Sequence, residues 1–466
     1  MVKLKTYSLV AVLLLFSWGV SQATETVNDV SRLNPVVMQR VIVPRTTDEV
    51  VAAVRTHAGP IAIGGGRYSM GGQTAEAQGI QLDMRQLNQL VAFDPAHKEI
   101  TVQAGMTWRS VQELIDPYDL SVSVMQTYNN FTVGGSLSVN AHGRYVSSGP
   151  LVSTVKRIHL VLADGTLVEA SPTEHEDLFY GALGGYGSLG VIVDATLALA
   201  DNVKVERQSV VMPLKDYSAY FANHIKGHPE VVFHNADLYP NDFDEVRATS
   251  YVRTDKPLTD QDRLIPLDRS YAKQRWIFRL ISDWPAGKFL RQHLIDPWIF
   301  SGSCVEWRNH EASYRAEELE PVSREQSTYV LEEYFVAMDR LGSFVERMRA
   351  VLKHYQVNAI NVSIRPAERD PGTYLAWAKT DVFALVLYYK QGTTAPERQH
   401  VGVWTRALID ASLAEQGSYY LPYQVWATPE QFYAAYPSAH KLFALKRAVD
   451  PTHKFRNRLL DTYDPD

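Results

Sequence analysis

The stretch Gly64-Gly65-Gly66-Arg67-Tyr68-Ser69-Met70-Gly71-Gly72 decides the fold, and it follows the short apolar run Ile61–Ile63. The apolar run predicts a β-strand, and the glycines after it permit a tight turn whose backbone N–H groups line a concave surface. Such a row of amides binds an anion, most often a pyrophosphate. Taken alone, the turn also leaves open a glycine-rich hairpin that binds no ligand.

This turn matches neither common nucleotide-binding pattern. Ser69 stands where a dinucleotide fingerprint requires glycine, and no Lys-Ser or Lys-Thr pair follows Gly71, as a P-loop would require. The sequence therefore predicts another kind of phosphate-binding loop.

A second glycine cluster spans residues 181–190 and contains a formal G-x-G-x-x-G at Gly185, Gly187 and Gly190. A dinucleotide fingerprint should open a helix, whereas the residues that follow, Val191–Leu197, are β-branched and strand-like. The motif is therefore not a dinucleotide-binding fingerprint. We expect a helix before it, with its N-cap near Ser171 or Thr173.

A third cluster reads Asn129-Asn130-Phe131-Thr132-Val133-Gly134-Gly135-Ser136-Leu137-Ser138-Val139-Asn140-Ala141-His142-Gly143. Its side chains are mostly small, so it could lie against a flat ring without steric conflict. Read alone, it could equally be a tight helix-packing segment in which His142 is a core histidine.

Length and composition describe a large globular protein. The chain has 466 residues, 45% of them apolar and 21% charged, which predicts two or more packed units. A net charge of −6 without a dense Lys/Arg block makes nucleic acid an unexpected partner. The single cysteine, Cys304, can form neither an intrachain disulfide nor a cysteine-rich zinc site, and we expect no metal.

The N-terminus has the pattern of a secretory signal peptide. Lys3 and Lys5 precede an apolar run over residues 7–20, and Ser21-Gln22-Ala23 places small residues at the positions a signal peptidase inspects. We expect cleavage after Ala23 and a periplasmic or secreted protein without a membrane span. An uncleaved anchor and a buried N-terminal helix are the alternatives. Loss of both lysines makes the net charge more negative, which disfavours an anionic membrane surface.

Hydrophobic patterns divide the rest of the chain. Short β-rich runs separated by glycine turns predict an α+β unit from Val36 to about Ala200, including a helix over 47–57. Longer alternating runs at 327–336, 358–364 and 382–389 predict a broad antiparallel sheet with helices on one face. One such helix should run over 341–355. The aromatic-rich stretch 276–307 could face a partner or a membrane, but we interpret it as packed helices.

Taken in order, the three clusters resemble the FAD-binding oxidoreductases of the vanillyl-alcohol-oxidase (PCMH) type, which include gulonolactone oxidase, alditol oxidase and cytokinin dehydrogenase. The resemblance covers residues 36–200 and returns in the closing segment Val449–Leu460. It implies a two-subdomain FAD-binding domain at 36–202, a substrate or cap domain at 203–425 and a C-terminal segment, 426–466, that returns to the FAD domain. Residues 1–23 would be the signal peptide.

The resemblance also assigns residues to FAD: the first turn to its pyrophosphate, the third cluster to the isoalloxazine and pyrophosphate, and the second to the adenosine and flavin side. The residues expected to bind FAD are Gly64, Gly65, Gly66, Arg67, Tyr68, Ser69, Met70, Gly71, Thr132, Val133, Gly134, Gly135, Ser138, Asn140, His142, Gly143, Gly187, Gly190, Val191, Ile192 and Asn457. Members with covalently attached flavin carry histidine before the serine of the first turn, where this chain has Tyr68. We therefore expect non-covalent FAD.

The expected catalytic residues lie in the middle of the chain and near its end. Sugar oxidases of the superfamily carry a Glu-x-Arg that faces the flavin, and the matching place here is Ser363-Ile364-Arg365, which keeps only the arginine. Glu333, on an alternating run, is a candidate replacement base; its alternative is a solvent-facing strand carboxylate. Arg365 could also be a salt-bridged sheet arginine.

Tyr423 is the third catalytic candidate. It belongs to Tyr419-Tyr420-Leu421-Pro422-Tyr423-Gln424, which is similar to the Gln-Tyr-Leu-Pro of cytokinin dehydrogenases. A tyrosine-rich wall suits a ring-bearing or amphiphilic substrate, although these aromatics could simply close a domain interface.

The resemblance implies an FAD-dependent oxidase or dehydrogenase. It would move a hydride from an alcohol, lactone or amine carbon of a small organic substrate to flavin N5, and then pass electrons to oxygen or another acceptor. The alternative is a flavin-binding protein without turnover, acting as an electron-transfer or assembly partner.

Overall fold

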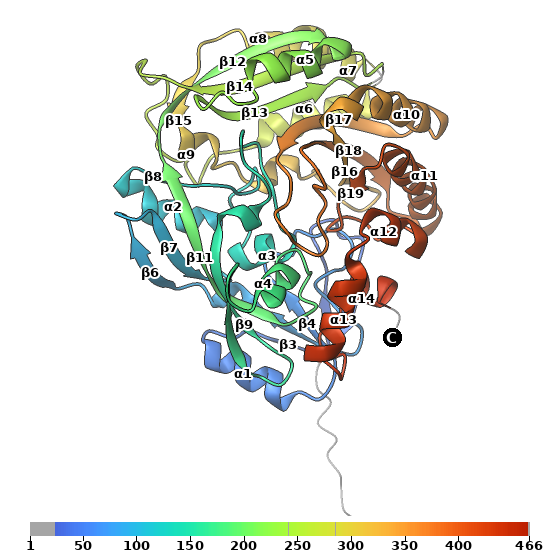
Figure 1. Ribbon diagram of the computed structural model, residues 1–466. Coiled ribbons are helices and arrows are strands. Elements are labelled where there is room, and N and C mark those ends of the chain that lie inside the picture. The colour runs from blue at the N-terminus through green and yellow to red at the C-terminus, as the bar shows by residue number, and fades with distance from the viewer. Residues whose placement is uncertain (1–23, 241, 285, 465–466) are drawn as a thin grey trace, which may run out of the picture.

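The computed structural model describes residues 24–240, 242–284 and 286–464. The expected signal peptide, residues 1–23, lies outside the described residues. Helices and strands alternate along the chain and build mixed layers (Figure 1), which confirms the α+β fold class. The predicted strands at 327–336, 358–364 and 382–389 and the helix at 341–355 are each present within a few residues of their expected ends.

Two small sheets open the fold. β1 (Glu25–Val27) pairs with β2 (Val36–Met38), and a parallel sheet has the order β3 (Arg40–Ile42), β5 (Ile80–Asp83), β4 (Ile61–Gly64). Helix α1 (Thr47–Thr56) begins where the Thr46 side chain accepts a hydrogen bond from the backbone N–H of Glu49, and it buries Val50 and Val54. The first glycine turn therefore leaves the end of a buried parallel strand.

A larger antiparallel sheet follows. Its members are β6 (Leu90–Asp94), β7 (Glu99–Gln103), β8 (Leu120–Val122), β9 (Val155–Val161), β10 (Leu167–Ala170) and β11 (Val191–Asp201), joined by α2 (Trp108–Ile115), α3 (Val133–Ser138) and α4 (Glu176–Ala182). The predicted N-cap of α4 is wrong. The helix begins after His175, which has no capping side chain, because the Ser171 hydroxyl instead accepts the N–H groups of Thr173 and Glu174 in a preceding turn.

The third layer is an eight-stranded antiparallel sheet with the order β15-β12-β14-β13-β17-β18-β16-β19. Its strands are β12 (Lys204–Pro213), β13 (Val231–Leu238), β14 (Glu245–Arg253), β15 (Val305–Trp307), β16 (Ser327–Ala337), β17 (Asn358–Ala367), β18 (Val382–Gly392) and β19 (Ser418–Tyr419). Helices α5 (Leu214–His224), α10 (Leu341–His354) and α11 (Ala395–Ala414) cover one face (Figure 1). Helix α6 (Ala272–Asp283) packs on part of the other face, and the rest of that face is left to the preceding sheets.

Short helices connect β14 to β15 and β16: α6 (Ala272–Asp283), α7 (Gly287–Leu290), a π-helical turn (Arg291–Ile295), α8 (Asp296–Ile299) and α9 (Arg308–Glu311). The chain ends with α12 (Pro429–Ala435), α13 (Ala439–Val449) and α14 (Arg458–Tyr463). Between the last two, Ile61 of β4 exchanges backbone hydrogen bonds with Lys454 and Arg456, so the C-terminal segment extends the first parallel sheet.

Candidate functional site

Two adjoining cavities lie where the first turn, α3 and the open face of the eight-stranded sheet meet. Their volumes are about 990 Å³ and about 590 Å³. Both are lined by Gly65 and Ser69 of the first turn and by Thr132 and Gly135 at the start of α3. They therefore form one extended cleft of the size that a large cofactor and a substrate require.

The backbone of the first turn offers unused donors to this cleft. Among the described residues, no hydrogen bond uses the backbone N–H of any residue from Gly66 to Ser69. Arg67 has φ of 60°, which turns successive amides toward one side. The Arg67 guanidinium is directed away and pairs with Asp83 at 3.1 Å. Four free amides beside a cleft fit a pyrophosphate.

Close packing against α3 explains the glycine at position 65. A Cβ there would lie 2.3 Å from the Thr132 Oγ1, which caps α3 by accepting the N–H of Gly135 at 3.3 Å. At the far end of the cleft, Gly187 has φ of +75°, a conformation that side chains rarely adopt. The chain thereby turns past Ile63 and leaves the narrow cavity open between the turn and β11.

Tyr68 occupies the place of the covalent histidine and faces the wide cavity. Its hydroxyl accepts a hydrogen bond from Asn130 Nδ2 at 2.6 Å, and its ring packs on Phe131. Burial, with Glu317 and Glu320 nearby, raises the pKa of Tyr68 to about 12, so the phenol stays protonated at neutral pH. A neutral, hydrogen-bonded phenol fits non-covalent attachment.

The wide cavity also has an apolar wall on the sheet. Tyr329 and Leu331 project from β16, and Tyr388 projects from its partner β18 in register with Leu331. Glu320 and Arg324 lie at the lip. The cleft therefore combines a polar turn with an aromatic wall that carries hydroxyl groups, and Tyr420 and Tyr423 of the tyrosine-rich segment also line it.

Glu333 continues the same face of β16, two residues beyond Leu331. Its side chain is only 2% exposed, and its Oε1 lies 2.7 Å from His142 Nε2 in an ion pair. Tyr423 lines the cavity and donates its hydroxyl to Glu333 Oε2 at 3.3 Å. The interpretation of Glu333 as a solvent-facing carboxylate is therefore wrong: the carboxylate lies one residue behind the cavity wall, linked to it by Tyr423.

Burial, strengthened by the charge of Glu333, holds the pKa of Tyr423 well above its usual range. Arg365, on β17, opposes this effect and is half-buried. Its Nε has no hydrogen-bond partner, and no ion pair involves Arg365 within the described part of the chain. The alternative that Arg365 is a salt-bridged sheet arginine is therefore wrong. Its positive charge, which pairs with no carboxylate of the described residues, lowers the pKa of Tyr423.

The residues predicted to bind FAD fall into two groups. Those that line the cleft are Gly65, Gly66, Arg67, Tyr68, Ser69, Met70, Thr132, Gly134, Gly135, Ser138, Gly187, Gly190 and Ile192. Those that do not are Gly64, Gly71, Val133, Asn140, His142, Gly143, Val191 and Asn457. Asn457, in the second group, supports the first, because its Nδ2 donates to the carbonyl of Tyr186 beside Gly187.

The sequence reasoning missed several wall residues. They include Val30, Gln73, Thr74, Met84, Ala104, Gln126, Tyr128, Ala316, Leu319, Glu320, Arg324, Tyr329, Leu331 and Tyr388. Alternation along β16 could have identified Tyr329 and Leu331 as neighbours of Glu333 on one face. The lip residues come from irregular chain, where no periodic signal exists.

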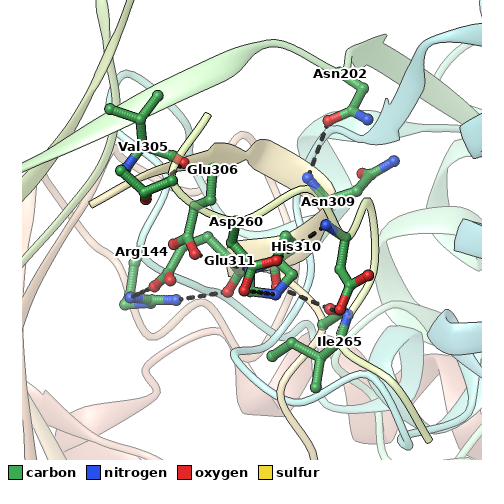
Figure 2. A network of polar contacts seen from close by, with 12 residues as sticks. Arg144, Asn202, Asp260, Ile265, Val305, Glu306, Asn309, His310 and Glu311 are labelled. Carbon is green, nitrogen blue, oxygen red and sulfur yellow. Dashed lines mark hydrogen bonds and ion pairs between the residues drawn. The ribbon is translucent and has the colours of Figure 1, made fainter. Parts of the chain in front are cut away.

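A buried polar network fixes the segment that follows His142 (Figure 2). Arg144 pairs with Glu311 at 2.6 Å, and His310 Nδ1 lies 2.8 Å from Glu306 and its Nε2 3.6 Å from Asp260. Complete burial, with Glu306 beside it, raises the pKa of Glu311 to about 8 although Arg144 acts against this. The network therefore ties α9 to the chain that carries His142.

Comparison with known proteins agrees with this geometry. A family described as FAD binding domain matches residues 38–171. The chain is 28% identical over 178 residues to L-gulonolactone oxidase from Mus musculus, covering 38% of this chain and 40% of that protein. It is 31% identical over 163 residues to cytokinin dehydrogenase 9 from Oryza sativa subsp. japonica, covering 34% and 31%. The chain thus matches well under half the length of these relatives.

The fold comparison extends over nearly the whole chain. A solved cholesterol oxidase from Brevibacterium sterolicum, in a His121Ala mutant form, superposes with a TM-score of 0.70 at 15% identity, covering 95% of this chain and 97% of that one. At this identity the likeness shows the fold alone. With the matched domain and the free amides beside the cleft, residues 38–171 form an FAD-binding domain related to that of the vanillyl-alcohol-oxidase (PCMH) type oxidoreductases, and FAD is the cofactor of this protein.

Proposed function

We propose that this protein oxidises the alcohol carbon of a ring-bearing or amphiphilic substrate bound in the wide cavity. The observation that carries the proposal is the Tyr423–Glu333 hydrogen bond, which links the cavity wall to a buried carboxylate paired with His142. When bound, FAD supplies an acceptor for a hydride equivalent from a substrate carbon. The protein must then position that carbon and remove the proton of the adjacent hydroxyl.

Tyr423 and Glu333 together can remove that proton. The Tyr423 oxygen accepts the substrate proton while its own proton passes to Glu333 Oε2. Tyr423 therefore stays a neutral phenol, and no phenolate forms in the buried site. This matters because burial strongly disfavours that phenolate. His142 Nε2, 2.7 Å from the other carboxylate oxygen, holds Glu333 in place. Arg365 lowers the pKa of Tyr423 and so eases the transfer.

The shape of the cavity favours the substrate class. Tyr329, Leu331 and Tyr388 provide flat apolar surface, while Glu320 and Arg324 at the lip provide charge. Short polyols would leave this apolar wall uncovered. We also propose that FAD is held without a covalent bond, because Tyr68 offers a neutral phenol, and that the protein is exported, because of its N-terminal pattern.

The test is anaerobic mixing of the FAD-loaded protein with a panel of alcohols, lactones and amines. Loss of visible flavin absorbance with ring-bearing or amphiphilic alcohols, and not with short polyols, is the expected result. Failure of every compound to reduce the flavin would instead favour a flavin-binding protein without turnover. Reduction by lactones or amines alone would refute the assignment to alcohols.

A further inference from the structure

Three short helices between β14 and β15 expose an unusual set of side chains. Trp276 is 62% exposed, Trp284 49% and Trp298 78%, and these are the exposed tryptophans in the part of the chain that the structure describes. Phe289 and Leu294, between them in sequence, are about as exposed. We call the outer surface of residues 269–284 and 286–300 the tryptophan face. The expectation that this stretch is simply packed is wrong for its outward side chains.

The charge of the tryptophan face opposes that of the molecule. Residues 269–300 contain six Lys or Arg and two Asp, in a chain whose net charge is −6. Arg291 and Asp296 are both buried and pair with each other at 3.2 Å, so neither adds to the surface, which is left with five Lys or Arg and one Asp. Lys273 and Lys288 have no acidic partner among the described residues. The tryptophan face is therefore locally positive although the net charge of the chain is negative.

The inner side of these helices borders the substrate cavity. Ile277, Phe278 and Ile281 of α6 pack against Tyr329 and Tyr388, which line it. Figure 1 shows α7 and α8 at the end of the molecule opposite α1. Helix α6 thus carries the exposed Trp276 and also packs on the cavity wall through Ile277, Phe278 and Ile281.

We propose that the tryptophan face docks onto the surface of an anionic lipid bilayer. Tryptophan rings with interspersed cations are the composition that lies at the boundary between headgroups and acyl chains, and cations there are attracted by anionic lipids. A second copy of this chain fits less well. A symmetric dimer through this face would bring the surplus of Lys and Arg on one copy against the same surplus on the other.

Docking would be interfacial. Among the helices of the described residues, none is long and apolar enough to cross a membrane. The proposal concerns this surface and does not depend on which substrate the cavity binds. From the negative net charge we expected an anionic membrane surface to be disfavoured. The proposal replaces that expectation, because attraction to a bilayer depends on the charges that face it within a Debye length.

The experiment is flotation of the FAD-loaded full chain with vesicles of phosphatidylcholine alone and of phosphatidylcholine mixed with phosphatidylglycerol. Wild type should float with the mixed vesicles, and added salt should release it. Trp276→Gln with Trp298→Gln should weaken binding at least about tenfold. Lys273→Gln with Lys288→Gln should weaken it about fivefold per charge, on the mixed vesicles only.

The matched control is Leu90→Gln with Val91→Gln, which removes exposed apolar side chains from β6 instead. This control should bind as wild type does. All variants share one N-terminus, so the apolar run at 7–20 cannot account for a difference between them. Binding of the double tryptophan variant at wild-type strength, or no wild-type binding to either vesicle, would overturn the proposal. So would a wild-type dimer in sedimentation that the tryptophan substitutions abolish.

Discussion

Replacement of Glu333 by glutamine tests the proposed proton path. Glutamine has nearly the same shape, and its amide oxygen can still accept the Tyr423 hydroxyl, now 3.3 Å from Glu333 Oε2. The variant therefore keeps the cavity wall and loses the base. Because general-base catalysis typically contributes about 10²- to 10⁴-fold in rate, we expect flavin reduction to slow by that factor, or about 2.7–5.5 kcal/mol in the barrier.

The adjacent residue provides the control. Glu332 is also buried on β16, at 3% exposed, but alternation turns it to the opposite face, near Tyr389. Burial raises the pKa of Glu332 well above its usual range, which favours the neutral carboxyl, so Glu332→Gln is expected to change little. Rapid anaerobic mixing, followed at the flavin absorbance, should show wild-type reduction in Glu332→Gln. The reasoning is refuted if Glu333→Gln is reduced as fast as wild type, or if both variants slow equally.

The remaining predictions concern the cofactor and stability. Gly65→Ala should weaken FAD binding by about tenfold or more, because its Cβ would lie 2.3 Å from Thr132 Oγ1. The control Gly342→Ala, on α10, should leave FAD binding unchanged, because its Cβ would meet nothing within 4 Å. A fluorescence titration with FAD compares the two variants, and equal affinities would contradict the packing argument. Acid precipitation should leave the yellow colour in the supernatant, since Tyr68 forms no flavin bond; a yellow pellet would show a covalent link. Because the pKa of Glu311 is raised, this side chain binds a proton more tightly in the folded protein than in the unfolded chain. The proton bound to Glu311 therefore stabilises the fold fully below about pH 4.5, and this stabilisation is lost as the pH rises to about 8. Glu311→Gln removes this dependence, so denaturant unfolding should show its stability rising relative to wild type by on the order of 5 kcal/mol over that range; parallel pH profiles would show that Glu311 does not titrate there.

Much of the fold was predictable because its signals are local. Glycine after Ile61–Ile63 marks a strand followed by a turn, and alternation at 327–336 marks a two-faced strand. The cofactor followed from three clusters in order. These features depend on neighbours in sequence, which sequence reasoning can assess.

The rest depends on contacts between distant segments. Glu333 and His142 are far apart in the chain, and alternation alone could not tell whether Glu333 met solvent or the cavity. Aromatic density at 276–307 likewise could not show that Trp276 and Trp298 point outward while Phe278 packs on Tyr388. The side that faces inward is set by the layer on which each element packs, and this is a property of the whole fold.

The most direct test of the account is an experimental structure of the FAD complex with a substrate alcohol. We expect the pyrophosphate within hydrogen-bond distance of the free amides of residues 66–69, and the substrate hydroxyl at the Tyr423 oxygen with its ring against Tyr388. A pyrophosphate bound elsewhere, or a substrate whose hydroxyl points away from Tyr423, would contradict the account.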